Sequence, residues 1–77
     1  ALQSKLAQAI DLLEHAESTT QDHADLLRLR LYRVEMLRRS EKADAARTLL
    51  RETLQDNRFK EQPSRIAAES LLKDMGG

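Results

Sequence analysis

The residues of this chain best suited to binding a ligand are five arginines between positions 28 and 39. A guanidinium group can hold a carboxylate through two parallel hydrogen bonds, so such a cluster suits an acidic peptide segment or a chain terminus. The same arginines could instead pair with the acidic side chains of residues 1–25. Both interpretations stay open, and the five residues are Arg28, Arg30, Arg33, Arg38 and Arg39.

Charge is segregated along the chain, although the formal net charge is zero. Residues 1–25 sum to −4 and residues 26–39 sum to +4. A nucleic-acid binder typically carries a net excess of positive charge, so we expect no nucleic-acid partner. We expect instead that an acidic first helix lies antiparallel to a basic second helix and faces it through Asp11, Glu14 and Glu17.

A metal site can be considered only at His15, which follows Asp11 by one helical turn. Zinc needs three or four converging ligands, and no further residue stands at metal-ligand spacing from this pair. The chain contains no cysteine, which excludes disulfides and thiolate metal sites. We therefore expect no metal and no cofactor, with His15 and Asp11 forming a surface pair.

Catalytic motifs are absent from the sequence. It contains no Gly-rich phosphate loop, no Ser/His/Asp set and no paired buried carboxylates, so we expect no enzymatic activity. A helix-turn-helix DNA-binding motif is also disfavoured. Its turn could form at residues 40–44, but the next helix carries Asp44, Glu52 and Asp56 where basic or amide residues would contact bases.

Composition indicates an all-α chain that forms one domain over residues 1–77. Hydrophobic residues make up 40% and charged residues 34% of the 77 positions, with only two glycines and one proline. No apolar run approaches the ~20 residues of a membrane-spanning helix, so we expect no direct membrane insertion. Cytoplasmic and periplasmic locations both stay open. Ala1 is not an initiator methionine, and we expect the chain to be a fragment of a longer protein.

Apolar periodicity predicts about four helices, over residues 2–17, 23–39, 43–55 and 63–75. A short connection before the last of them contains Phe59, which we expect to plug the edge of the core. Ile10 and Leu12 stand beside the stripe of the first helix, and we expect both to remain exposed. The predicted stripes are Leu2, Leu6, Ala9, Leu13 and Ala16 in the first helix, Ala43, Ala46, Leu49, Leu50, Thr53 and Leu54 in the third, and Ile66, Ala67, Leu71 and Met75 in the fourth.

The second predicted helix carries apolar residues on two sides. One side is centred on Leu27, Leu31 and Val34. A helix that is apolar on two sides is usually packed on two sides, so we expect this helix to form the middle layer. The other side consists of Leu26, Leu29, Tyr32 and Met36.

Two segments echo each other at an offset of 37 residues: Ala9-Ile-Asp-Leu-Leu-Glu-His-Ala16 and Ala46-Arg-Thr-Leu-Leu-Arg-Glu-Thr53. Each has a small residue, leucines three and four positions later, and a small residue at position seven. This period is close to one helix-turn-helix repeat of a solenoid. The pattern resembles the second helix of a tetratricopeptide (TPR) repeat. Residues 29–34, followed by Ala45-Ala46 and Leu49-Leu50, also resemble bacterial TPR-like domains attached to the cell envelope.

The TPR resemblance implies an antiparallel helical hairpin array, a fragment of an α-α superhelix, that acts as a non-enzymatic protein–protein interaction scaffold or assembly module. First helices of the repeats line the concave face of such arrays. Carried over by position, the partner-binding candidates are Leu29, Arg30, Tyr32 and Arg33, which suit an acidic protein or peptide. The turn after Ser40 lacks the glycine that the family usually has there.

Two alternatives remain from the sequence. Residues 25–33 also resemble the Arg-rich helix of small all-helical chorismate mutases, which implies a helical-dimer enzyme that binds a dicarboxylate. The first helix here is acidic, whereas that family places arginine there. The other alternative is a purely structural oligomerisation bundle. We expect a homo-oligomer or a missing flanking domain, because the terminal helices lack polar outer faces.

Overall fold

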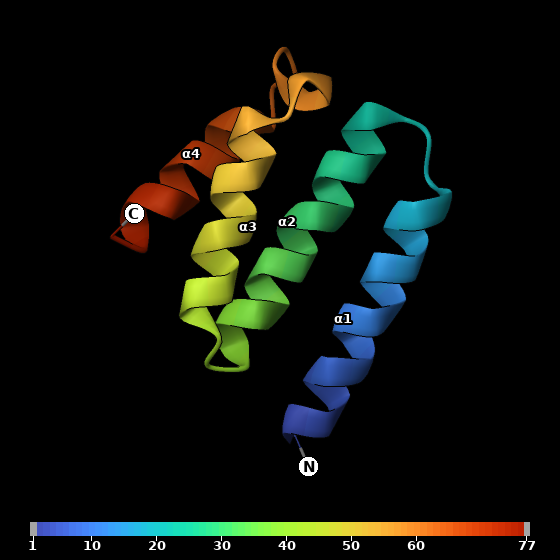
Figure 1. Ribbon diagram of the computed structural model, residues 1–77, viewed down its shortest axis with the longest axis vertical. Helices are drawn as coiled ribbons and strands as arrows, with labels where there is room; N and C mark the ends of the chain where they lie inside the picture. The colour runs from blue at the N-terminus through green and yellow to red at the C-terminus, as the bar shows by residue number, and fades with distance from the viewer. Residues whose placement is uncertain (1, 77) are drawn as a thin grey trace.

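The computed structural model describes residues 2–76, with the side chain of Leu2 outside the described part. These residues form four α-helices and no strand, so the predicted all-α hairpin array is confirmed. Successive helices run antiparallel, and each packs chiefly on its neighbours in the chain (Figure 1). The elements are α1 (Leu2–Thr19), α2 (His23–Arg39), α3 (Ala43–Gln55), the short 3-10 helix η1 (Asn57–Phe59) and α4 (Arg65–Asp74).

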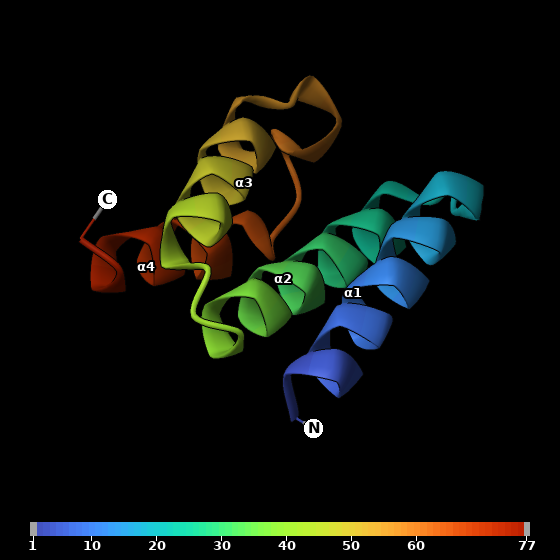
Figure 2. The ribbon, with the colours of Figure 1, turned by 60° about the horizontal axis from the view of Figure 1, so that its bottom comes forward.

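The array is a flat slab with principal extents of 38 × 31 × 15 Å. Figure 2 shows α3 raised out of the row that α4, α2 and α1 form. Helix α2 contacts both α1 and α3, so the prediction that it forms the middle layer is confirmed. Among the helices of residues 2–76, none has the length and apolar character needed to cross a membrane.

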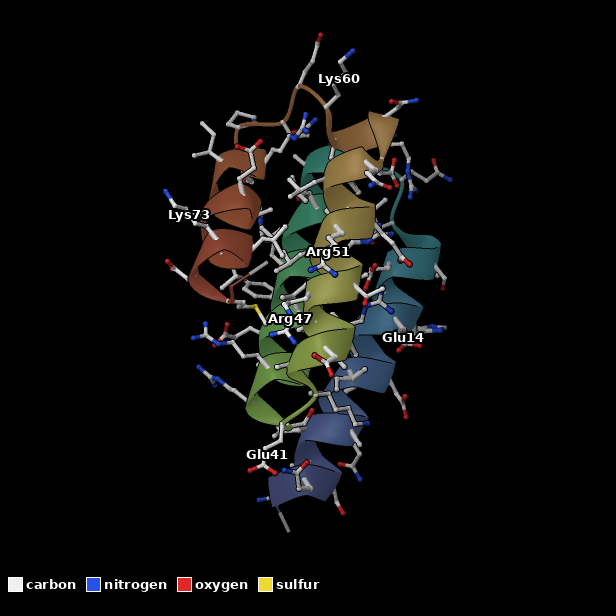
Figure 3. All side chains as sticks on the ribbon, turned by 60° about the vertical axis from the view of Figure 1, so that its left-hand side comes forward. Glu14, Glu41, Arg47, Arg51, Lys60 and Lys73 are labelled. Carbon is white, nitrogen blue, oxygen red and sulfur yellow. The ribbon has the colours of Figure 1, made fainter. Side chains whose placement is uncertain are left out.

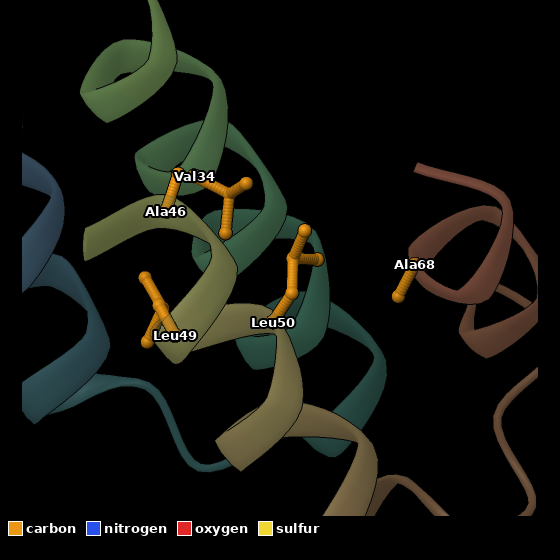
Figure 4. Packing of buried hydrophobic residues seen from close by; sticks show 5 residues of the cluster. All are labelled: Val34, Ala46, Leu49, Leu50 and Ala68. Carbon is orange, nitrogen blue, oxygen red and sulfur yellow. The ribbon is translucent and has the colours of Figure 1, made fainter. Parts of the chain in front are cut away.

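The main core lies between α2, α3 and α4. Of the inward residues predicted for α3, Ala46, Leu49, Leu50 and Thr53 are buried, whereas Ala43 and Leu54 are partly buried. The hydroxyl of Thr53 donates to the carbonyl oxygen of Leu49 over 2.7 Å. Ala46 has no exposed surface, which fits a position where a neighbouring helix approaches closely. Figure 4 shows the buried members of this cluster, Val34, Ala46, Leu49, Leu50 and Ala68.

A second core group joins the start of α2 to η1. Phe59 is fully buried against Leu26 and Leu27, so the prediction that it plugs the core is confirmed. The burial of Leu26 shows that the second apolar side of α2 is divided. Leu26 turns inward, whereas Tyr32 of the same predicted side remains 54% exposed.

The prediction for the flank of α1 was half right. Leu12 is 71% exposed, as expected, but Ile10 is buried together with Leu6. These two residues are four positions apart and therefore share one side of the helix. Because α2 packs against the Leu6–Ile10 side of the predicted stripe, Ala9 and Leu13 at its centre are only partly covered.

The predicted stripe of α4 was half right, because Leu71 and Met75 pack against the core but Ile66 and Ala67 do not. Ile66 is 73% exposed and Ala67 is also exposed, while Ala68 is buried. The helix begins at Arg65, two residues after Pro63, because turns occupy the connection from η1. At 100° per residue the observed inward set covers a narrower arc than the predicted one, and it adds a second leucine to the core. That set is Ala68, Leu71, Leu72 and Met75.

Candidate functional site

The outward side of α2 presents a stripe that we call the outer stripe: Asp25, Leu29, Tyr32, Met36 and Arg39. Alternating spacings of four and three residues keep these side chains on one side of the helix. Asp25 and Arg39 are exposed, Leu29 and Met36 are half-buried, and Tyr32 at the centre is 54% exposed. The outer stripe therefore has an acidic end, an apolar middle and a basic end.

An open hollow of about 430 Å³ lies beside the N-terminal half of the outer stripe. Its lining residues are Thr20, Asp25, Arg28, Leu29 and Tyr32. Thr20 comes from the turn after α1, where its hydroxyl donates to the carbonyl oxygen of Ala16 over 2.6 Å. The Asp22 carboxylate accepts a 3.0 Å hydrogen bond from the Asp25 backbone N–H and caps α2 at this end of the hollow.

Two of the four partner-binding candidates, Leu29 and Tyr32, line this hollow, whereas Arg30 and Arg33 point elsewhere. Arg30 Nε donates to Glu17 Oε1 over 3.1 Å, and Arg33 Nε lies 2.9 Å from Glu17 Oε2. Arg33 Nη1 also reaches Glu14 Oε1 at 3.5 Å. The predicted pairing of the acidic first helix with the basic second helix is thus confirmed for these residues.

The pairing differs in one member from the expected set. Asp11 is exposed and takes part in none of the ion pairs found among residues 2–76. Within that part of the chain, no three carboxylate or imidazole side chains converge as metal ligands, and His15 is exposed. Arg28 pairs with Asp25 at 3.5 Å, and Arg39 with Glu35 at 3.4 Å, both on the solvent side of α2.

Arg30 has further contacts that connect α1 and α2 to η1. Its Nη1 lies 3.7 Å from Asp56 Oδ2, and its guanidinium carbon lies 5.3 Å from the centroid of the Phe59 ring. The guanidinium of Arg58 stands at the same distance from this ring. Side-chain hydrogen bonds from Arg58 lower the pKa of Asp56 to about 2. Arg30 Nε and Arg33 Nη2 both donate to Glu17 Oε1, so these two side chains are engaged within the molecule.

Other charged side chains lie at the surface, among them Lys60 and Lys73 (Figure 3). Sequence reasoning missed Asp25, Arg28 and Thr20 as neighbours of Tyr32. The four-and-three spacing from Asp25 to Tyr32 was available as a signal, but the position of Thr20 depends on the turn. The site therefore presents the aromatic ring of Tyr32 and the aliphatic side chain of Leu29, with the acidic Asp25 and the basic Arg28 beside them.

The comparisons with known proteins supply no assignment for this site. No protein-family model matches the chain, and neither a curated protein nor a solved structure matches it. The geometry of the outer stripe and of the ion pairs behind it is therefore what bears on function.

Proposed function

We propose that this chain is a TPR-like, non-enzymatic protein-interaction or assembly module that contacts its partner through the outer stripe of α2. The observation that carries the proposal is the exposure of Tyr32 beside the hollow. Tyrosine brings a large contact area at low conformational cost and is enriched at protein interfaces. In residues 2–76 the other large hydrophobic side chains with high exposure, Leu12 and Ile66, do not line this hollow.

The ion pairs behind the outer stripe support the same proposal. The side chain of Glu17 is 8% exposed and contacts both Arg30 and Arg33, so this carboxylate connects α1 to α2. A rigid support reduces the entropy lost when a partner binds. In this proposal Leu29 and Tyr32 touch the partner, while Arg30 and Arg33 hold the two helices in place.

The arrangement supports an interaction module over the chorismate-mutase-like alternative. A dicarboxylate substrate needs guanidinium groups that face an accessible cavity with their donors free. Arg30 Nε and Arg33 Nη2 instead donate to Glu17, and the hollow beside Tyr32 is lined by Arg28 together with the carboxylate of Asp25. That carboxylate would repel an anionic substrate.

The test is affinity capture from the native organism with three baits: the wild-type chain, the variant Tyr32→Glu and the control Ile66→Glu. The control also places a charge at an exposed apolar position, but on α4. We expect the wild type and the control to retain the same partners and Tyr32→Glu to lose them, with unchanged helical circular dichroism. Retention of the same partners by Tyr32→Glu would show that the outer stripe is not the binding surface.

A further inference from the structure

We propose that the outer stripe binds a second copy of this chain, with the two α2 helices antiparallel about a twofold axis at Tyr32. This inference rests on the proposed function and names the partner. An isologous dimer uses the same surface on both subunits, so that surface must be complementary to itself. The outer stripe meets this requirement through the order of its residues.

Charge complementarity follows from the positions of the two ends. Asp25 and Arg39 stand seven residues before and seven residues after Tyr32. Antiparallel pairing about Tyr32 places Asp25 level with Arg39 of the partner subunit, and this contact occurs twice. Parallel pairing would instead place each of these charges against its own copy, which disfavours it.

The apolar middle is complementary in the same arrangement. Leu29 and Met36 lie three residues before and four residues after Tyr32, so each comes level with the other residue in the second copy. Spacings that alternate between three and four are those of helices packed side by side in coiled coils. The two Tyr32 rings meet at the axis, where each faces the hollow beside Leu29 in the other copy.

A second pair of charges flanks the axis. Arg28 and Glu35 precede and follow Tyr32 by four and three residues, so antiparallel pairing places Arg28 beside Glu35 of the partner subunit. Within the described part of one chain these residues form only pairs at the surface, Arg28 with Asp25 and Glu35 with both Arg38 and Arg39. Exposed pairs of this kind contribute little to stability, so exchanging them for pairs between subunits costs little.

The first test measures self-association of the full 77-residue chain by sedimentation equilibrium. We expect a monomer–dimer equilibrium for the wild type, unchanged in Ile66→Glu. In Tyr32→Glu the dissociation constant should rise at least about a hundredfold, because both copies lose a central aromatic contact and gain a buried charge. A wild-type chain that stays monomeric at millimolar concentration would overturn the proposed dimer.

The second test separates the antiparallel charge pattern from a general surface effect. Arg28→Glu and Glu35→Arg each place like charges against each other across the interface. We expect each to raise the dissociation constant about tenfold, since the contact occurs twice. The double variant Arg28→Glu/Glu35→Arg restores opposite charges between subunits while keeping the same repulsion within each chain. The dissociation constant of the double variant should therefore return toward the wild-type value. A dissociation constant higher than that of either single variant would contradict the antiparallel pairing.

The third test uses the absence of cysteine from the sequence. In an equimolar mixture of Leu29→Cys and Met36→Cys under mild oxidation, we expect the disulfide to join the two different variants. An Ile66→Cys control should join neither. Disulfides formed only within each variant would contradict the antiparallel arrangement.

These results separate this inference from the proposed function. If the wild-type chain is monomeric but captures a different protein, and Tyr32→Glu does not capture that protein, the proposed function stands and the second copy is not the partner. If Tyr32→Glu captures the same partners as the wild type, the proposed function of the outer stripe is contradicted.

Discussion

Arg30 Nε donates a 3.1 Å hydrogen bond to Oε1 of Glu17, and this contact connects the basic helix α2 with the acidic helix α1. Glu17 is 8% exposed, and Arg33 approaches its other oxygen. One carboxylate thus neutralises two largely buried guanidinium groups. Two of the residues best suited to bind an external carboxylate are occupied by an internal one.

Replacing Glu17 should destabilise the fold far more than replacing its neighbour Glu14. Glu17→Gln leaves the guanidinium groups of Arg30 and Arg33 without their shared counter-charge, at a cost of about 2 kcal/mol in the free energy of unfolding. Glu14 is 53% exposed and touches only the edge of Arg33, so Glu14→Gln should stay within about 0.5 kcal/mol. Urea denaturation followed by circular dichroism measures both, and equal losses would contradict the central place of Glu17.

Ile10 and Leu12 are close in sequence but should respond differently to truncation. Ile10→Ala removes buried aliphatic carbon and should lower the free energy of unfolding by about 2 kcal/mol. Leu12→Ala changes an exposed position, and its effect should be below about 0.5 kcal/mol. Both variants make the same kind of change, so thermal denaturation of the pair compares the two environments directly. A larger loss for Leu12→Ala would mean that the packing of α1 is wrong.

Asp56 should contribute stability that depends on pH. Its pKa is lowered from 3.8 to about 2 in the folded chain by side-chain hydrogen bonds from Arg58. The stabilisation is therefore complete above about pH 4 and is lost as the pH falls toward 2. Because Arg58 is about half exposed and solvent screens the pair, we expect about 1 kcal/mol at pH 7.

The variant Asp56→Asn isolates this effect. Asn keeps a side-chain oxygen that can accept the 2.9 Å hydrogen bond from the Arg58 backbone N–H, but it cannot ionise. The wild type and the variant should differ in urea midpoint at pH 7 and converge near pH 2. A difference that does not change with pH would mean that the charge of Asp56 is not the cause.

Replacing Glu41 with glycine should stabilise the folded chain. Glu41 has φ = 66°, a left-handed conformation that is unfavourable for side chains with a Cβ, and it stands in the turn where the sequence lacks glycine. Glu41→Gly should raise the free energy of unfolding by up to about 1 kcal/mol. The adjacent Lys42 has φ = −106°, so Lys42→Gly should not stabilise. Thermal denaturation distinguishes them, and stabilisation by both changes would contradict the strain at Glu41.

Helix boundaries were largely predictable because their signals are local. The predicted second and third helices, over residues 23–39 and 43–55, match α2 and α3. The end of the fourth was correct to within one residue, since α4 ends at Asp74 and Gly76 takes φ = 77° two residues later. The rotation of α4 was not predictable, because η1 and the turns after it decide which side of the helix meets α3.

The site was only partly predictable for a related reason. Periodicity placed Leu29 and Tyr32 on one side of a helix, and charge segregation predicted that arginines would pair with the acidic helix. Neither periodicity nor charge segregation could decide which arginines turn inward. Arg30 turns inward because Glu17, Asp56 and Phe59 converge on it from α1 and η1.

The sequence by itself determined the all-α class, the spans of the second and third helices and the antiparallel match of opposite charge, since each depends on spacing within a helix or on composition. The tertiary structure alone decided that Arg30 and Arg33 pair with Glu17 of α1, and that Tyr32 remains at the surface beside the hollow. The physical reason is that burial depends on which neighbouring helix covers a side. Periodicity finds the sides of a helix, but only packing determines which of them is left for a partner.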